Sequence, residues 1–533
     1  MIPPQVELSA RGETVRITVY DGAGVIGGNK ILLEDGDTAV FLDFGMSFGT
    51  RGLYFEEFLK PRSASGLADL LEFDLLPPLP GLYRTDMDTG ADDLWQVAQG
   101  RPGYRRLDHL DGVVVSHAHV DHTGYLSFLR PDIPVYTSPI TAVIAKAIQD
   151  TAPSDFEREV FYQSPRTSKN GLLASAPRDP LVVRPFYLFG DGEIGEELAS
   201  FWFQKEGLRP VTGPLPAVAA DRIGNLHVRY FPVDHSIPGA MAFALETSAG
   251  WVVYTGDLRL HGKNGDATRR FAAEAAKLHP VCLICEGTHP DTQKPVTEEE
   301  VYDNADPAVA REPGLVIADF GPRNVERLLT FRAVAEHNGR RLAVLSKDAY
   351  LLAALHRADP RMPDPAADPG LVVYVKNRVQ RQKWEECFLD SYASDHIVSW
   401  AEVRAHPEEF ILCLSFWDLS ELIDLKTYGG TYIYSSSEAY DEEAALDLQR
   451  LRNWLNHFQL RMVGDPGDRQ GVGREPGFHA SGHIHGPGLD ELIRTIAPRY
   501  LVPVHTQNRG FFERFRDQMQ VIWPGRGQPI TLP

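Results

Sequence analysis

The sequence predicts a mixed α/β protein that folds into more than one domain. Its 533 residues exceed what one ordinary hydrophobic core organises. Short apolar runs rich in β-branched residues recur, and several end in His or Asp, as the run 113–115 does before His117. Beyond residue 312, apolar runs alternate with helical periodicity, which is the pattern of a parallel sheet covered by helices.

Composition limits the class of protein. Hydrophobic residues make up 43% of the chain and charged residues 24%, as in globular proteins that fold in water. No apolar stretch approaches the roughly 18 residues of a membrane span, and the N-terminus lacks the basic and apolar segments of a secretory signal. Four cysteines are too few for a disulfide framework, so the expected compartment is a reducing cytoplasm.

The formal net charge is 53 − 73 = −20. Affinity for nucleic-acid phosphates scales with the number of cationic contacts, which argues against a broad, non-specific grip on nucleic acid. A narrow basic channel or a metal-centred phosphate site remains compatible with this charge. An acidic nuclease would depend on its metals and on a few local Arg and Lys residues.

The first strands are expected at 15–20 and 39–43. The second ends in Asp43, whose carboxylate could orient a metal-bound histidine from behind, with an exposed turn residue as the alternative. The glycines between these strands are expected to form turns, because no G-x-G-x-x-G pattern opens a helix there. Residues 50–108 and 151–225 are expected to be irregular insertions.

The densest group of polar residues is His117-Ala118-His119-Val120-Asp121-His122, at the end of the strand predicted at 113–115. Three imidazoles and a carboxylate in six residues crowd one another unless a cation compensates. Imidazole and carboxylate together suit zinc, and two such ions suit phosphate-ester hydrolysis. A polar loop with incidental histidines is the weaker interpretation. Short helices are expected after the motif, at 123–129 and 141–149.

Four more apolar strands end in a residue that can bind a metal or carry a proton. These residues are His235, Asp257, Glu286 and His505, after the strands predicted at 228–233, 251–254, 281–285 and 500–504. The repeated design predicts that the side chains gather at one edge of a sheet.

Two features near these strands allow more than one interpretation. Arg259, His261 and Lys263 could face a phosphate or form a solvated loop. Cys282 and Cys285 form a C-x-x-C pair inside a strand, where residues three apart point to opposite faces. We therefore expect these cysteines to lie in the core.

The second region of the chain alternates strands and helices. Strands are expected at 314–320, 341–345, 371–375, 410–414 and 431–434, and helices at 324–338 and 442–458. Basic side chains concentrate there: Arg323, Arg327 and Arg332 on one helix, and Lys376, Arg378, Arg381 and Lys383 before Trp384. Basic residues beside an aromatic suit single-stranded nucleic acid, while a solvated helix face is the alternative for each of them.

Taken in chain order, the motifs resemble those of the metallo-β-lactamase superfamily. Asp43, the 117–122 motif, His235 and Asp257 match its first four motifs. Glu286, His483 and His505 resemble motifs A, B and C of its β-CASP nucleases. Asn29, Ser236-Ile237-Pro238 and residues 480–505 are similar to the ribonuclease J group of that family.

The resemblance implies an α/β architecture, a metallo-β-lactamase αββα sandwich with an inserted β-CASP α/β domain. The first part of the sandwich would occupy residues 1–290, with the insertions at about 50–108 and 151–225. The β-CASP domain would occupy 291–470. Residues 471–533 would return to the sandwich.

The resemblance also implies roles for individual residues. His117, His119 and His235 would hold one zinc ion. Asp121, His122 and His505 would hold the other, with Asp257 as the bridging ligand and Asp43 behind the ligands. The catalytic residues would be Asp121, His483 as general acid and Glu286 holding His483 in place. Substrate would contact Ser481, Gly482 and His479.

The implied function is a zinc-dependent ribonuclease that cleaves single-stranded RNA by a two-metal mechanism, as a 5′-exonuclease, an endonuclease or both. Two Zn²⁺ ions are the expected cofactors, with Mn²⁺ or Mg²⁺ as substitutes. RNA is the expected partner, no membrane is involved, and a homodimer is allowed. The alternatives are a DNA nuclease of the same fold and a small-molecule hydrolase of the lactonase or thioesterase type. An inactive RNA-binding subunit is disfavoured, since no ligand position is replaced.

Overall fold

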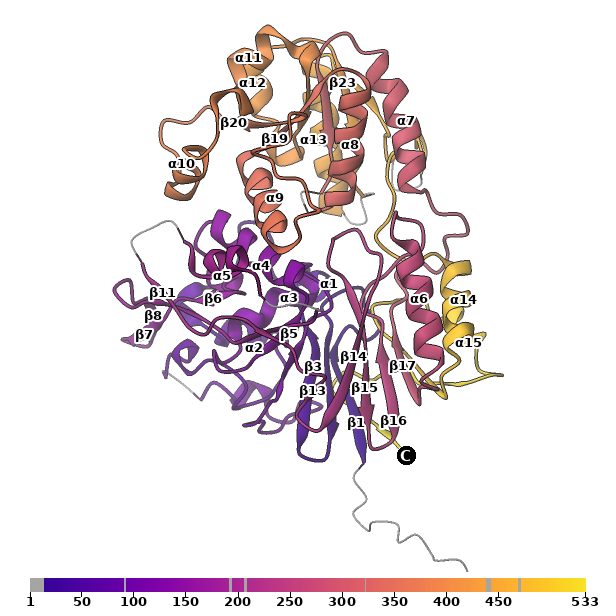
Figure 1. Ribbon diagram of the computed structural model, residues 1–533. Coiled ribbons are helices and arrows are strands. Elements are labelled where there is room, and N and C mark those ends of the chain that lie inside the picture. The colour runs from indigo at the N-terminus through magenta and orange to yellow at the C-terminus, as the bar shows by residue number, and fades with distance from the viewer. Residues whose placement is uncertain are drawn as a thin grey trace, which may run out of the picture.

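A computed structural model describes residues 14–90, 93–190, 194–205, 209–321, 323–437, 442–467 and 471–533, without the side chains of 442 and 443. Its described strands form three large sheets and two small ones. Two large sheets lie face to face in the lower part of Figure 1, and the third lies above them. None of the described helices is long and apolar enough to cross a membrane.

The first large sheet has eight strands in the order β12-β10-β5-β4-β3-β2-β1-β27. In chain order they are β1 Val15–Asp21, β2 Lys30–Asp35, β3 Thr38–Phe44, β4 Gly112–Val114, β5 Val135–Thr137, β10 Phe186–Leu188, β12 Ala217–Val218 and β27 Pro529–Leu532. β1, β2 and β3 are antiparallel, whereas β3 to β12 run parallel. The last strand of the chain pairs with the first.

The second large sheet has seven strands in the order β13-β14-β15-β16-β17-β25-β26. They are β13 Arg222–Ile223, β14 Leu226–Pro232, β15 Met241–Thr247, β16 Gly250–Tyr254, β17 Cys282–Cys285, β25 Tyr500–Pro503 and β26 Gln520–Val521. β25 pairs with β17 although more than 200 residues separate them, so the C-terminal segment completes this sheet.

The two sheets share one apolar core. Val40 and Leu42 of β3 belong to the same buried cluster as Val252 of β16 and Ile284 of β17. The outer face of the second sheet is covered by α6 Gly265–Ala276, α14 Gly486–Ile496 and α15 Arg509–Glu513. The outer face of the first sheet packs against α2 Ala68–Glu72 and α4 Pro139–Thr151. This is the expected αββα sandwich, and the prediction of the fold class is confirmed.

Cys282 and Cys285 confirm the alternation expected of β17. Cys282 lies in the core between the two sheets, and Cys285 lies in the cluster under α6 and α14. Both thiols are free and fully buried.

The third large sheet is entirely parallel, in the order β21-β20-β19-β22-β18-β23-β24. Its strands are β18 Val316–Asp319, β19 Arg341–Leu345, β20 Leu371–Val375, β21 Ile397–Ser399, β22 Phe410–Cys413, β23 Thr431–Tyr434 and β24 Arg461–Val463. These strands lie inside the range 291–470, whose limits stay a prediction. Parallel sheets bury both faces, which explains the continuous apolar runs in the sequence.

Helices cover both faces of this third sheet. One face packs against α7 Glu298–Ala310, α8 Val325–His337 and α9 Ser346–Ala358, and the other against α11 Trp400–Ala405, α12 Glu421–Leu425 and α13 Glu442–His457. α7 begins with the Thr297–Glu300 capping box. A shorter helix, α10 Lys383–Leu389, lies at the edge of this body.

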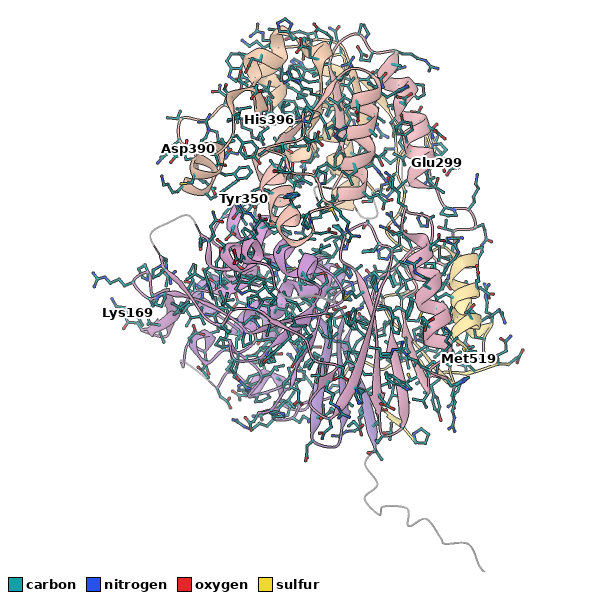
Figure 2. All side chains as sticks on the ribbon, viewed as in Figure 1. Lys169, Glu299, Tyr350, Asp390, His396 and Met519 are labelled. Atoms are coloured by element: carbon teal, nitrogen blue, oxygen red, sulfur yellow. The ribbon has the colours of Figure 1, made fainter. Side chains whose placement is uncertain are left out.

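The third body contacts the sandwich through α9, which lies against α4 and α5 Glu196–Phe203. Figure 2 shows Tyr350 of α9 at this junction, and its hydroxyl donates to Asp150 of α4 over 2.9 Å. Phe201 of α5 lies 6.2 Å from the Tyr350 ring, between ring centres. The sandwich and the domain of the third sheet therefore share a packed interface formed by α4, α5 and α9.

Two local expectations are confirmed only in part. The chain after the central motif forms α3 Val120–Thr123 and then a tighter 3₁₀ turn, Gly124–Phe128, in place of one helix at 123–129. The segment 151–225 is not irregular throughout, because it contributes β10 and β12 to the first sheet and holds a hairpin of β7 Arg166–Lys169 and β8 Leu172–Ser175. Such strands, of two to four residues, are too short to show a period in sequence. The described part of 50–108 holds short helices: the end of α1 Phe48–Gly52, α2 and 3₁₀ turns.

Candidate metal centre

All seven expected ligands lie at one edge of the sandwich, where parallel strands end. They follow β4, β14, β16 and β25, and they form two groups: His117, His119 and His235, and then Asp121, His122, Asp257 and His505. The carboxyl ends of parallel strands meet at the same edge of a sheet, which brings together residues almost 400 positions apart in sequence. The chain turns sharply to reach this edge, since Asp43 and His505 both have left-handed backbone (φ 57° and 52°).

The first group consists of three imidazoles whose nitrogens converge. His119 Nδ1 lies 3.1 Å from both His117 Nε2 and His235 Nε2. The remaining nitrogens of the two outer rings are occupied: His117 Nδ1 lies 3.0 Å from Ser116 Oγ, and His235 Nδ1 lies 2.5 Å from the Gly482 carbonyl. Because Ser116 gives its own proton to Asp43, it accepts from His117.

This arrangement fits a cation. A neutral imidazole has one donor and one acceptor nitrogen, so His117 and His235 both point lone pairs at His119. Burial holds the pKa values of His117 and His235 well below their usual range, and it lowers that of His119 to about 4. One proton on His119 Nδ1 could satisfy only one of the two lone pairs, whereas a zinc-type ion accepts all three.

The second group combines carboxylates and imidazoles. Asp257 Oδ2 lies 3.1 Å from His122 Nε2 and 3.6 Å from His505 Nε2. Asp121 Oδ2 lies 3.2 Å from His505 Nε2. Burial opposes charge on His122, but Asp257, Asp43 and Asp121 outweigh it and raise its pKa far above the usual value. The site therefore attracts positive charge, which a bound cation would supply.

Asp257 lies between the two groups. Its Oδ2 is also 3.7 Å from His117 Nε2 of the first group. Its other oxygen, Oδ1, is buried and has no hydrogen-bond donor among the described residues. Buried carboxylate oxygens are rarely left without a partner, so this one fits a shared metal ligand.

Asp43 lies behind the second group, as expected, and the structure adds partners that the sequence did not reveal. The Asp43 carboxylate accepts from His122 Nδ1 over 2.6 Å, from Ser116 N and Oγ over 2.7 Å each, and from the Tyr254 hydroxyl over 2.6 Å. Asn29 in turn donates to the Tyr254 hydroxyl over 3.0 Å. This chain of bonds fixes the His122 ring with Nε2 toward Asp257.

We predict that Asp43→Asn weakens metal binding about tenfold to a hundredfold, the usual effect of losing a ligand's supporting partner. The amide would place a donor against His122 Nδ1–H, while Asn still tolerates the left-handed backbone. Competition with a chromogenic chelator measures the affinity. Asp111→Asn is the matched control, because Asp111 accepts from Ala39 N at the other end of the same strand. Equal metal affinity in Asp43→Asn and the parent would contradict this role.

His483 and Glu286 form a pair beside the ligand groups. His483 Nδ1 lies 3.1 Å from Glu286 Oε2. Glu286 is fully buried and also accepts from Leu258 N (2.8 Å) and the Thr288 hydroxyl (2.8 Å). The His483 side chain keeps 20% of its surface exposed. Burial alone would lower its pKa, but the Glu286 and Asp257 carboxylates raise it to about 9.

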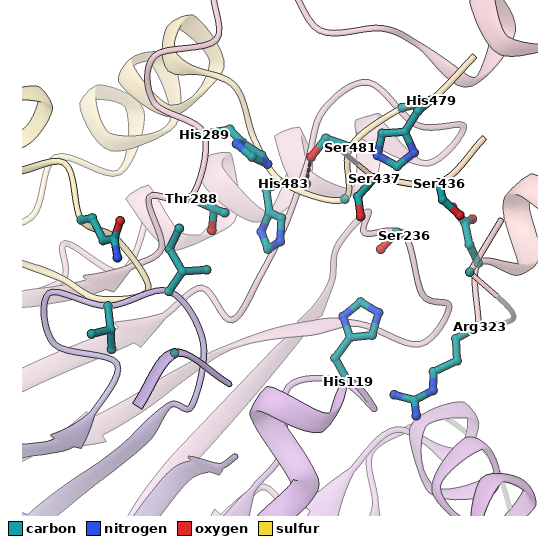
Figure 3. A pocket seen from close by; sticks show the side chains of 18 of the residues that line it. His119, Ser236, Thr288, His289, Arg323, Ser436, Ser437, His479, Ser481 and His483 are labelled. Atoms are coloured by element: carbon teal, nitrogen blue, oxygen red, sulfur yellow. Dashed lines mark hydrogen bonds between the residues drawn. The ribbon is translucent and has the colours of Figure 1, made fainter. Parts of the chain in front are cut away.

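His483 borders a cavity of about 1,050 Å³ between the sandwich edge and the third sheet. The three expected substrate-binding residues, His479, Ser481 and Gly482, line it, together with His119, Arg323 and the serines 435–437 (Figure 3). Burial lowers the pKa of His479 to about 4, so this imidazole is neutral. His119 of the first ligand group and His483 both line this cavity, so a bound molecule could contact both.

Two glycines permit close approaches that a side chain would block. A Cβ on Gly45 would lie 1.7 Å from the Asp121 carbonyl oxygen, and a Cβ on Gly482 would lie 2.5 Å from Ser236 Oγ. Gly45 therefore allows the loop after β3 to pack on the central motif. Gly482 lets the segment carrying His483 pack on His235.

Two of the basic residues considered in the sequence, Arg259 and Arg327, behave differently from either expectation. Arg259 is buried and pairs with Glu326 and with Asp234, while its Nη1 donates to the Ser481 carbonyl over 3.1 Å. Arg327 is buried and makes a two-point pair with Glu298 (2.8 and 2.9 Å). The two arginines hold segment 478–483 in place, and neither faces solvent or the cavity.

Comparison with known proteins gives a consistent result. No family model matches the chain. A ribonuclease J from Sinorhizobium meliloti is 25% identical over 442 residues, which are 80% of this chain and 61% of that protein. A ribonuclease J from Mycobacterium tuberculosis is 22% identical over 520 residues, 95% of this chain and 70% of that protein. The chain thus spans 61% and 70% of the lengths of these two relatives.

One solved structure covers almost the whole chain. A protein of unknown function from Enterococcus faecalis matches 97% of this chain and 100% of its own, with a TM-score of 0.65 and 20% identity. At that identity the match shows a shared fold. That fold is the αββα sandwich with a third, parallel sheet described above. In sequence, the chain is similar to these two ribonuclease J proteins over 80% and 95% of its length.

Proposed function

We propose that the chain is a two-zinc ribonuclease that hydrolyses single-stranded RNA. The observation that carries the proposal is the sharing of Asp257 by two convergent ligand groups, next to the His483–Glu286 pair and open to one cavity. Two adjacent divalent ions suit in-line displacement at a phosphate. The ribonuclease J relatives support RNA as the substrate.

The proposal gives each ion its own set of ligands. His117, His119 and His235 would hold one, and Asp121, His122 and His505 the other, with Asp257 shared. Three imidazoles suit Zn²⁺, and Mn²⁺ or Mg²⁺ would be weaker substitutes at an imidazole-rich site. When bound, the ions would activate a water molecule and neutralise charge on the phosphate.

The residues of the chain then supply the proton. Glu286 accepts from His483 Nδ1, so it holds the ring in one orientation and stabilises its charged form. Nε2–H is then available to the departing oxygen of the cleaved linkage, as general acid. Asp43 and Thr288 keep the His122 and His505 rings oriented, Thr288 by accepting from His505 Nδ1 over 2.8 Å.

Segment 479–482 is proposed to hold the end of the strand. Ser481 and the close backbone at Gly482 offer a hydroxyl and a tight approach beside His483, and neither requires net positive charge. A 5′-monophosphate held there would place the next linkage at the metals. Mononucleotide products would follow.

We predict that a 5′-monophosphorylated RNA is degraded faster than 5′-triphosphorylated and 5′-hydroxyl versions of the same RNA. A triphosphate adds charge and bulk, and a hydroxyl lacks the anchor. Purified protein is incubated with RNA labelled at its 5′ or 3′ end, and the product ladder is read. Matched DNA and a chelated sample are the controls. Equal rates and identical internal products on all three RNAs would remove the end-binding pocket, and faster cleavage of DNA would favour a DNA nuclease.

A further inference from the structure

One cavity residue remains without a partner. Among the described residues that line the cavity, Arg323 is the only one with a permanently charged side chain. No acceptor in the described part of the chain lies within hydrogen-bond distance of its guanidinium, and no described carboxylate pairs with it. A half-buried guanidinium with five unused donors is costly unless a ligand takes them.

Its neighbours in sequence and space are different. Arg259 and Arg327 lie close to the same segment, but both are buried and paired with Glu326 and Glu298. The N–H groups of Arg259 and Arg327 are therefore already used in ion pairs and hydrogen bonds within the protein. Among the described residues that line this cavity, Arg323 is therefore the one unpaired cation, in a chain whose net charge is −20.

The position of Arg323 follows from the third sheet. It lies in the short connection between the end of β18 and the start of α8, where parallel α/β sheets bind their ligands. Figure 3 shows the guanidinium reaching toward His119, on the side away from His483. Burial lowers its pKa to about 10, which the Asp121 carboxylate opposes, so the group stays charged at neutral pH and lies within electrostatic reach of the metal ligands.

The rest of the lining limits what the ligand can be. Val25, Ile26 and Leu53 also line the cavity, and the last two are 42% and 74% exposed. An inorganic anion would gain nothing from contact with these aliphatic side chains. A nucleotide would contact both Arg323 and the aliphatic side chains, because it joins an anionic phosphate to a base with apolar faces.

We propose that Arg323 binds a phosphate group of the nucleic-acid strand, on the His119 side of the metal centre. The planar guanidinium matches two phosphate oxygens at once. This inference rests on the proposed function and names one residue that recognises its substrate. Either a terminal or an internal phosphate supplies the required chemistry.

The test measures binding and not turnover. Metal-loaded protein carrying His483→Ala serves as the parent, so that RNA stays intact, as a gel of the recovered RNA verifies. Fluorescence anisotropy with a labelled single-stranded RNA gives Kd at several salt concentrations. In this parent, Arg323→Gln is expected to raise Kd about tenfold to a hundredfold. It is also expected to flatten the slope of log K against log salt by about 0.7.

Two further variants separate charge from geometry. Arg323→Lys keeps the charge and loses the two-pronged donor, so the salt slope is expected to recover while Kd recovers only in part. Arg361→Gln is the control, because Arg361 is exposed, lies outside the cavity and pairs with Asp359. It is expected to leave Kd and the slope unchanged.

The 5′ group identifies the phosphate. If Arg323→Gln costs more affinity on 5′-phosphorylated than on 5′-hydroxyl RNA, the terminal phosphate is the ligand; an equal loss on both identifies an internal linkage. Unchanged Kd and slope in Arg323→Gln would overturn the inference. Wild-type protein that binds RNA through Arg323 without cleaving it would refute the proposed function alone, and a parent that binds no RNA would refute both.

Discussion

Replacing His119 by alanine is expected to remove bound metal and RNA cleavage together. His119 Nδ1 lies 3.1 Å from the Nε2 atoms of both other imidazoles in its group. Its loss therefore removes the ligand atom that lies next to both of the others. Only His117, His235 and the shared Asp257 would remain for this ion, so its affinity should fall steeply. Elemental analysis should find about two ions per wild-type chain and about one or fewer in the variant.

His227→Ala is the matched control for this experiment. His227 lies on β14, the strand that leads to His235, but it is partly exposed and pairs with Asp221 at the far end. Metal content and cleavage should be unchanged in it. Full activity in a metal-free wild-type preparation would disprove the metal site, and so would full activity of His119→Ala without metal.

The second large effect is expected at His483. His483→Ala should keep both ions and lose cleavage by about 10²–10⁴-fold, the usual contribution of a general acid. The reason is geometric: Nδ1 of His483 is bonded to Glu286, and its ring lies on the open side of the ligand groups. Single-turnover rates with saturating RNA separate this loss from a loss of binding.

His505→Ala provides the contrast. His505 Nε2 faces Asp121 and Asp257, and its Nδ1 is held by Thr288, so its removal should release one ion. Elemental analysis of the two variants side by side distinguishes a ligand from an acid. Equal metal loss in His483→Ala and His505→Ala would mean that the two roles are wrongly assigned.

The sequence predicted the fold class and the place of the ligand residues for one physical reason. Each of the apolar runs that lead to the site was followed within three residues by His, Asp or Glu, and parallel strands deliver such residues to a common edge. The structure brings His117, His235 and Asp257 together at this edge, as the pattern indicated. The same reasoning located Asp43, because it ends the strand next to β4.

The partners of these residues could not be predicted in the same way. Tyr254 supports Asp43 from more than 200 positions away, and inside β16 it looks like any apolar core residue. Arg259 was expected either to face a phosphate or to lie in a solvated loop, yet it is buried and pairs with Glu326 of α8. Such contacts depend on how distant elements pack, and no local period in the sequence records them.

The two buried ion pairs have a mechanical consequence. Arg259 joins the sandwich to α8 through Glu326, and Arg327 of α8 joins Glu298 and the carbonyl oxygens of segment 478–483. Breaking one buried pair costs about 3–5 kcal/mol, so the two bodies resist hinging apart at this point. We therefore expect the cavity beside His483 to keep a fixed width: if RNA is the substrate, a single strand should enter it, and folded RNA too wide for the cavity should not.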